Sequence, residues 1–281
     1  MKFGKLESVD HLEFSLDVPA QEYSFLPNDN HSGMLEIIIG GTVWGVPEWK
    51  GIHFPAKAKP TEFLHYYSRL FPCIEFNGSH YRTPPVVQVA NWVEQVPSNF
   101  LFCPKFPQSI SHWRQFQNCE RETDLFMETL FAFGKNLGTT FIQLPPHYSP
   151  SKAEPLLRYL EKLPRDVRYS VEVRHPDWFV GNVLEEYAEE LKKLNVGLIV
   201  CDTAGRRDAV HMRLTSDELV IRFGGNDLHA SDEFRMNQWA RQLRDWEKVG
   251  LKKCYFWIHQ PDSLHAVESM NQFKEVLSNY K

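Results

Sequence analysis

The sequence predicts an α/β fold, a single-domain (β/α)8 or TIM barrel with an N-terminal extension, on three observations. Eight apolar runs of strand length follow one another from residue 35 onward, and helical patterns fill most of the gaps between them. The middles of the first and last runs lie near residues 37 and 256, so the strands recur about every 31 residues, which is typical of a βα unit. No Gly-x-Gly-x-x-Gly turn or Walker-type loop follows a strand, which argues against a doubly wound open sheet.

The predicted strands are rich in Ile, Val, Phe and Tyr, and the predicted helices carry apolar residues at helical spacing. The strands cover residues 35–40, 73–77, 100–105, 140–144, 168–174, 196–202, 219–224 and 253–259. The helices cover residues 61–71, 86–96, 120–137, a stretch after Ser151, 183–194, 232–249 and a last stretch that ends at Tyr280. Residues 203–218 have a weak helical period, so we expect a short or loop-like crossover there.

The first 33 residues show no steady period and mix charges with Pro19, Pro27 and Gly33. We interpret residues 1–33 as an extension that wraps or caps the body, and residues 34–281 as the barrel domain. A chain of 281 residues fits one barrel.

Composition excludes several classes of protein. The formal net charge of -5, from 31 basic and 36 acidic residues, gives no global basic excess and argues against nucleic acid as a partner. The five cysteines are widely spaced and odd in number, which argues against a disulfide framework or a zinc knuckle and fits a reducing compartment. Apolar stretches of signal-peptide or membrane-spanning length do not occur. We therefore expect a cytoplasmic protein without a membrane partner.

Polar residues end seven of the eight predicted strands. If the apolar neighbours in each strand face the helices, the polar residues face the inside of the barrel at its carboxyl end. Barrel enzymes keep their chemistry at that end. The residues predicted to face inward are Glu75, Asn77, Lys105, Gln143, Glu172, Arg174, Asp202, Arg222 and His259.

The charges of this set predict the class of ligand. Carboxylates and basic groups are balanced, three against three, whereas a divalent-cation site would show an excess of carboxylates and imidazoles. We therefore expect no metal, no cofactor, and a small organic ligand with an anionic end. The predicted catalytic residues are Glu75, Lys105, Glu172, Arg174 and Asp202.

Further contacts to the ligand are predicted from loops that follow strands. Arg222 with Gly224 and Gly225 predicts an anion site, because glycines allow backbone N–H groups to face a phosphate. His175 is either a general base or a residue that orients its loop through a hydrogen bond. Tyr81 either stacks on a sugar or base or packs its loop. The predicted substrate-binding residues are Asn77, Tyr81, Gln143, His175, Arg222, Gly224, Gly225 and His259.

Five linked motifs over about residues 36–280 resemble the YecE-like family, also labelled domain of unknown function 72. They are Ile39-Gly40 with Trp44, Pro47, Trp49, Gly51 and Phe54-Pro55; Glu75-Phe-Asn77 with Tyr81-Arg82 and Pro84; Gln143-Leu-Pro-Pro146; Val171-Glu-Val-Arg-His-Pro176 with Trp178; and Asp202. The resemblance implies a TIM-barrel fold and implies no reaction. The sequence departs from the family pattern at Gly41-Thr-Val43, Ser79-His80, Gly224 and His259-Gln260.

Three functions follow from these patterns. The first is a cofactor-independent enzyme that acts on a small anionic molecule, such as a sugar phosphate or a nucleotide fragment, with Glu172 or Glu75 as acid/base. A glycosidase that uses both carboxylates is a variant of this function, and the separation of the two would decide it. The second is a ligand-binding or regulatory protein without catalysis. The third is a metal-dependent, nuclease-like hydrolase.

Overall fold

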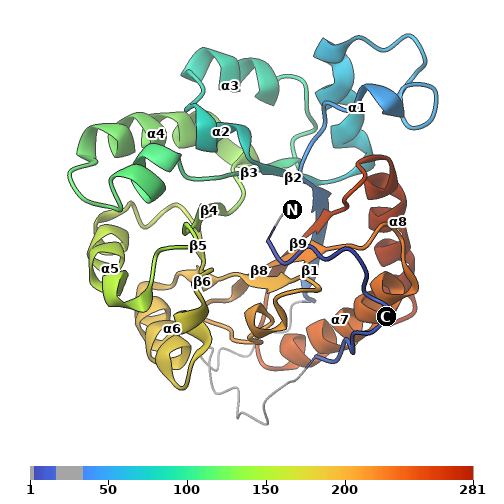
Figure 1. Ribbon diagram of the computed structural model, residues 1–281. Helices are drawn as coiled ribbons and strands as arrows, with labels where there is room; N and C mark the ends of the chain where they lie inside the picture. Colours follow the sequence, from blue (N-terminus) through green and yellow to red (C-terminus); the bar gives the residue numbers. More distant parts are fainter. Residues whose placement is uncertain (1–2, 17–33, 281) are drawn as a thin grey trace. The chain divides into compact units, whose positions relative to one another are not determined.

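The computed structural model describes residues 3–16 and 34–280 and shows an α/β fold whose strands pair in parallel (Figure 1). The chain forms two compact units. Unit 1 combines Met1–Gly41 with Gly197–Lys281, and unit 2 is the continuous stretch Thr42–Val196. None of the helices in the described parts of the chain combines the length and the apolar content that crossing a membrane needs.

Unit 2 contains four short strands with parallel pairing. They are β2 (Cys73–Phe76), β3 (Leu101–Pro104), β4 (Thr140–Gln143) and β5 (Tyr169–Glu172). β2 pairs with β3, and β4 pairs with β5. A parallel bridge between Lys105 and Phe141 joins the ends of β3 and β4. The carboxyl ends of the four strands therefore meet at one edge of unit 2.

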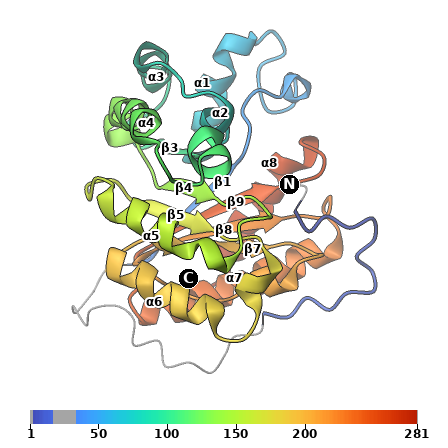
Figure 2. The same ribbon diagram turned by 60° about the vertical axis from the view of Figure 1, so that its left-hand side comes forward.

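The helices of unit 2 follow one another outside these strands (Figures 1 and 2). They are α1 (Phe63–Leu70), α2 (Gly78–Tyr81), α3 (Val86–Val93), α4 (Glu120–Ala132), α5 (Ala153–Lys162) and α6 (Val183–Leu194). Pro85 precedes α3 with extended backbone, and Asn195 ends α6 in the left-handed conformation, as is usual at helix ends. A five-residue π-helix covers Ser109–Trp113.

The strands of unit 1 are β1 (Glu36–Gly41), β6 (Gly197–Leu198), β7 (Val200–Asp202), β8 (Glu218–Gly224) and β9 (Lys253–His259). All but the two-residue β6 pair in parallel within the unit, in the order β1–β9–β8–β7. Its helices α7 (Ala230–Lys248) and α8 (Leu264–Ser278) lie side by side. Phe256 packs on Phe273 of α8 and on Trp239 of α7, so this side chain marks the helix-covered face of the strands.

Most predicted strands lie within a few residues of the observed ones. The run 196–202 differs, because it divides at Ile199 into β6 and β7. Between β7 and β8, the structure holds only the 3-10 turn Arg207–Ala209. The prediction of a loop-like crossover is therefore confirmed.

Residues 3–16 pack on the rest of unit 1. The side chain of Gln238 in α7 accepts from Leu16 N (3.0 Å) and donates to Phe14 O (2.9 Å). The Phe14 ring lies 5.3 Å from the guanidinium carbon of Arg207 and 5.1 Å from that of Arg235. Val9, Phe14 and Ala204 form a small apolar cluster. Residues 1–2 and 17–33 of the predicted extension lie outside the described residues, and the division into extension and barrel domain stays a prediction.

Candidate functional site

The polar residues that end the strands of unit 2 share one face. Phe102 packs against Phe133 at the end of α4 and so marks the helix-covered face. Ile74 is in register with Phe102, and Glu75 with Cys103. Since side chains alternate along a strand, Glu75 lies on the face opposite the helices, as the sequence predicts. In β4 and β5 the paired residues Gln143 and Glu172 lie away from Tyr169, whose hydroxyl reaches Met127 of α4.

A continuous chain of hydrogen bonds links four of the predicted site residues. Lys105 Nζ donates to Gln143 Oε1 (2.7 Å), and Gln143 Nε2 donates to both carboxylate oxygens of Glu172 (3.2 and 3.1 Å). Arg174 Nε donates to Glu172 Oε1 and forms an ion pair with it. Lys105, Gln143 and Glu172 are buried, and the Arg174 side chain is 14% exposed. Two cations therefore flank a buried carboxylate at one strand edge.

Glu75 and Asn77 form a second pair at the same edge. Asn77 Nδ2 donates to Glu75 Oε1 at 2.8 Å, and Glu75 is fully buried. Tyr81 is 75% exposed, and its ring contacts that of His80 with 5.3 Å between centroids. The predicted stacking of Tyr81 on a ligand stays a prediction.

His80 and His112 form a pair that the sequence interpretation missed. Their rings meet edge to face with centroids 4.8 Å apart. His80 Nδ1 lies 2.7 Å from the carbonyl oxygen of Phe106, so this nitrogen carries the proton and donates. The π-helix Ser109–Trp113 places His112, and such segments are frequent at functional sites. No regular spacing joins residues 80 and 112, and only their strand-end positions hint at proximity.

Both histidines are kept neutral. Burial, with the nearby Lys105 and Arg174 cations, lowers the pKa of His80 to about 4, although its bond to Phe106 opposes the shift. Burial and the neighbouring His80, Lys105, His147 and Arg174 lower the pKa of His112 to about 4. Lys105 and Arg174 thus act on the same small region as the histidine pair and oppose its protonation.

His175 orients its own loop. Its Nδ1 accepts a hydrogen bond from Asp177 N at 3.2 Å and so caps the 3-10 turn Pro176–Phe179. Trp178 in this turn is fully buried and donates from Nε1 to Tyr148 O at 2.8 Å. Of the two roles predicted for His175, the structure shows the loop-orienting one.

Arg222 and His259 share one face of unit 1. The register pairs Arg222 with Trp257 and Gly224 with His259, whereas Phe223 and Phe256 contact each other on the helix-covered face. Arg222 is 3% exposed and His259 is 7% exposed. Both side chains therefore lie on the face opposite α7 and α8, as predicted.

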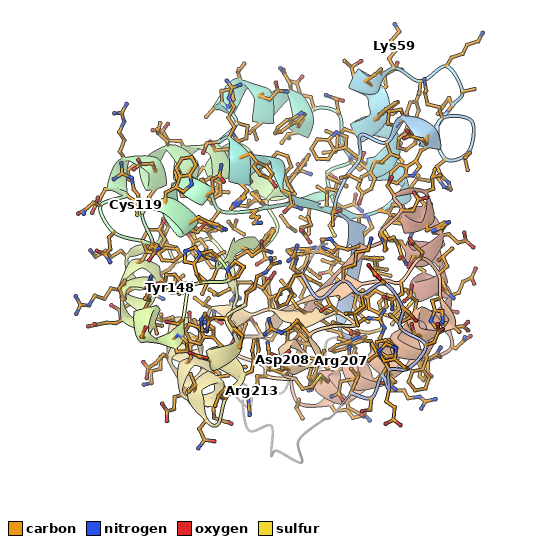
Figure 3. All side chains as sticks on the ribbon, in the orientation of Figure 1. Lys59, Cys119, Tyr148, Arg207, Asp208 and Arg213 are labelled. Carbon is orange, nitrogen blue, oxygen red and sulfur yellow. The ribbon has the colours of Figure 1, made fainter. Side chains whose placement is uncertain are left out.

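Asp202 lies on the other face, and this corrects the prediction for its orientation. The register pairs Asp202 with Phe223, which faces α7. Its carboxylate accepts from Arg235 Nη1 (3.0 Å), from Trp239 Nε1 (2.7 Å) and from Arg207. Figure 3 labels Arg207 and Asp208 on the turn that follows β7. Burial raises the pKa of Asp202, but Arg235, Arg207 and the Trp239 hydrogen bond outweigh it and lower that pKa. Asp202 is thus ionised and holds α7 against β7 through its bonds to Arg235 and Trp239.

The turn at Gly224 and Gly225 already holds an anion, and that anion is a carboxylate of the same chain. Asn226 N donates to both oxygens of Asp232 (3.0 and 2.9 Å), and Gly225 N donates to His259 O (2.8 Å). A Cβ on Gly225 would lie 2.3 Å from Gln260. The backbone donors predicted to face a phosphate are therefore used inside the protein. That part of the prediction is wrong, and contact of Arg222 with a ligand stays a prediction.

Possible metal ligands do not gather in groups of three or more among residues 3–16 and 34–280. The five cysteines are buried and none of them forms a disulfide.

Comparison with known proteins places the chain in a family. The family model described as protein of unknown function DUF72 matches residues 38–281. The chain belongs to the DUF72 family. This finding confirms the resemblance carried by the sequence motifs.

The chain is also similar to one curated protein and to solved structures of DUF72 proteins. The UPF0759 protein YecE of Escherichia coli K12 is 29% identical over 260 residues, which cover 86% of this chain and 92% of YecE. A DUF72 protein of Thermotoga maritima MSB8 superposes with a TM-score of 0.68 at 22% identity and covers 86% of this chain and 99% of its own. A DUF72 protein of Enterococcus faecalis V583 superposes with a TM-score of 0.67 at 18% identity. The superposition covers 87% of this chain and 98% of the Enterococcus chain. These structures show a shared α/β fold.

Proposed function

We propose that this DUF72 protein binds a small anionic organic molecule, such as a sugar phosphate or nucleotide fragment, at the strand edge of unit 2. We propose further that it acts on this molecule by acid/base chemistry without a cofactor. One observation carries the proposal: Lys105 and Arg174 stand at the two ends of the hydrogen-bonded chain through Gln143 and Glu172. A lysine and an arginine at one strand edge are the groups that recognise phosphate and carboxylate.

The proposed roles follow from position. Arg174 is the most accessible member of the chain, so its guanidinium is the first cation that an entering anion meets. Glu172 is the leading acid/base candidate because its carboxylate is held between Gln143 and Arg174. Glu75 is the second candidate, and Asn77 and Gln143 orient the two carboxylates.

The neutral histidines support an anionic rather than a cationic ligand. The Lys105 and Arg174 charges lower the pKa of both His80 and His112. A cationic ligand would add to the same repulsion, whereas an anion would relieve it.

Two broader features belong to the proposal. The eight-stranded (β/α)8 barrel is supported by the parallel βα order within each unit and by the structural relatives. A cytoplasmic location is supported by the five cysteines, none of which forms a disulfide.

Titration calorimetry with ribose 5-phosphate and with ribose tests the anion site. We expect ribose 5-phosphate to bind and ribose to bind at least about tenfold more weakly, because the phosphate supplies the charge that Arg174 and Lys105 pair with. Arg174→Gln should weaken binding of the phosphate by about tenfold or more.

Arg165→Gln is the matched control, because Arg165 is an exposed arginine of the same unit whose Nη1 bonds Leu194 O. It should leave binding unchanged. Equal affinity for ribose and ribose 5-phosphate, or equal loss in the two arginine variants, would overturn the proposed site.

A further inference from the structure

Unit 1 contains a cavity of about 750 Å³ that the anion site of unit 2 does not use. Its floor is formed by residues at or just beyond the carboxyl ends of β7, β8 and β9, among them Thr203, Asn226 and His259. Residues 3–10 form its opposite wall. The carboxyl ends of parallel strands are the usual place for ligands in α/β proteins.

The cavity presents oxygen acceptors, because its backbone donors are already used. The N–H groups of residues 225, 226 and 227 donate to His259 O, to Asp232 and to Gln260 Oε1. The Asn226 side chain donates from Nδ2 to Ser231 Oγ. Asp227 Oδ1 already accepts from Asp262 N (2.9 Å) and lies 3.4 Å from His265 Nδ1. The acceptors that this wall offers a ligand are therefore the Asn226 amide oxygen and the other carboxylate oxygen of Asp227.

The opposite wall reinforces this preference. Ser231 N donates to His229 Nδ1 (3.2 Å), so the proton of His229 is on Nε2, which donates to Asp10 Oδ1 (3.2 Å). The neutral His229 ring therefore has no further N–H group that could donate to a ligand. The fixed charges that line the cavity are Glu7, Asp10 and Asp227 against Lys5. An acceptor-rich, acidic lining selects a ligand that donates hydrogen bonds and carries positive charge.

A second, independent observation comes from Thr203. This residue lines the cavity, is 3% exposed, and its Oγ1 has no hydrogen-bond partner among the described residues. A buried hydroxyl without a partner requires an explanation. Gly4 covers it with a left-handed backbone (φ +68), and a Cβ on Gly4 would lie 2.1 Å from Thr203 Oγ1. A ligand that displaces Gly4 slightly would give this hydroxyl its partner.

We propose that the cavity binds a small hydrophilic organic amine. Its ammonium group pairs with Asp227 and donates to the Asn226 amide oxygen, and one of its hydroxyls bonds Thr203 Oγ1. The segment 3–10 completes the site by supplying Asp10. This site is separate from the anion site proposed in unit 2. Failure of one proposal would therefore leave the other unaffected.

Three probes test the proposal: glucosamine, glucose and glucose 6-phosphate. They share the glucose ring and differ in charge. Backbone amide chemical shifts are followed by NMR in the full-length protein. We expect glucosamine to shift the amides of Asn226, Asp227 and Gly205, since Gly205 N donates to Gly4 O at the edge of the cavity. We expect glucose to bind at least about fivefold more weakly, and glucose 6-phosphate to leave these amides unchanged.

Two variants locate the site. Asp227→Asn should weaken glucosamine binding by about fivefold or more, whereas Asp245→Asn, an exposed aspartate on α7, should not change it. Thr203→Val should weaken binding without lowering the thermal stability of the free protein, because it removes a hydroxyl that has no partner. Absence of shifts with glucosamine at about 100 mM, shifts caused by glucose 6-phosphate, or equal binding in the two aspartate variants would overturn the proposal.

Discussion

The carboxylate of Asp232 accepts two hydrogen bonds from the backbone N–H of Asn226, at 3.0 and 2.9 Å. Asp232 is fully buried in the first turn of α7 and also accepts from Arg235 Nη2 (2.8 Å) and Gln260 Nε2 (3.2 Å). The turn after β8 therefore binds an internal anion, and this fixes the start of α7 against the ends of β8 and β9.

Replacing Asp232 should uncover the anion site that the sequence predicts. Asp232→Ala leaves the buried Arg235 guanidinium without this partner, so we expect a loss of about 3–5 kcal/mol in the free energy of unfolding. Sulfate should restore part of this loss in Asp232→Ala by entering the vacated turn, and should do less for the wild type. Chemical denaturation with and without sulfate measures both effects. Asp245→Ala, an exposed aspartate of the same helix, is the control; equal sulfate effects in all three proteins would refute the expectation.

Glu172→Gln should destabilise the protein by about 3 kcal/mol, because it leaves Arg174 beside an uncharged, buried amide. If Asp202 faced inward, as the sequence predicts, it would offer Arg174 a second partner and the loss of stability would be about 1 kcal/mol or less. Asp202 is instead engaged by Arg207, Arg235 and Trp239. Urea unfolding of the wild type and of Glu172→Gln measures the difference. A loss below about 1 kcal/mol would show that other groups compensate Arg174.

The stability of the protein should fall in acid partly through His80. Burial and the Lys105 charge lower the pKa of His80 to about 4 from 6.5, so the folded state keeps the ring neutral. The stabilisation is complete above pH 6.5 and is lost as the pH falls from 6.5 to about 4, where the unfolded chain takes up the proton first. Between pH 6.5 and pH 4 the free energy of unfolding of the wild type should fall by roughly 2–3 kcal/mol more than that of His80→Gln.

Urea unfolding at the two ends of that pH range measures this loss. His11→Gln is the control, since residue 11 is exposed, and its pH profile should follow the wild type. Parallel profiles for the wild type and His80→Gln would contradict the assignment of the acid sensitivity to His80.

Phe14→Leu should loosen residues 3–16 from unit 1. Leucine keeps much of the apolar contact with Val9 and Ala204 but loses the ring that faces Arg207 and Arg235. Each such contact is worth about 0.5–1 kcal/mol, so the amide of Gly205 should exchange with solvent roughly fivefold faster. Native-state hydrogen exchange measures this rate, with the amide of Phe256 within β9 as the internal reference. An unchanged Gly205 rate would show that Phe14 does not hold the segment.

The fold could be predicted because apolar runs and helical periods are local signals. The last strand, Lys253–His259, and α6, Val183–Leu194, have the predicted limits. The facing of Glu75 and Glu172 could also be predicted, because each stands between apolar neighbours. In the run 196–202 the residues around Cys201 are apolar on both faces, as in many parallel strands, so alternation carries no signal for Asp202.

The contacts that decide the roles of residues come from distant positions. Two of the three partners of Asp202 are Arg235 and Trp239, 33 and 37 positions along the chain, and no periodicity in the sequence connects them to Asp202. The sequence predicts an open anion site at the turn that contains Gly224. In the structure the first turn of α7 places the Asp232 carboxylate in that turn. The His80–His112 contact depends on a π-helix that hydrophobic patterns do not predict.

The division of the chain has a consequence for its synthesis. Unit 2 is one continuous stretch, so the contacts within it join residues that all leave the ribosome before residue 197. Unit 1 must wait for the last residues: β1 pairs with β9, Glu36 opposite Lys253, and Leu16 bonds Gln238, 222 positions later. Closing such long loops is slow. During translation Phe14 and the edge of β1 that pairs with β9 therefore stay without these partners until nearly the whole chain is made.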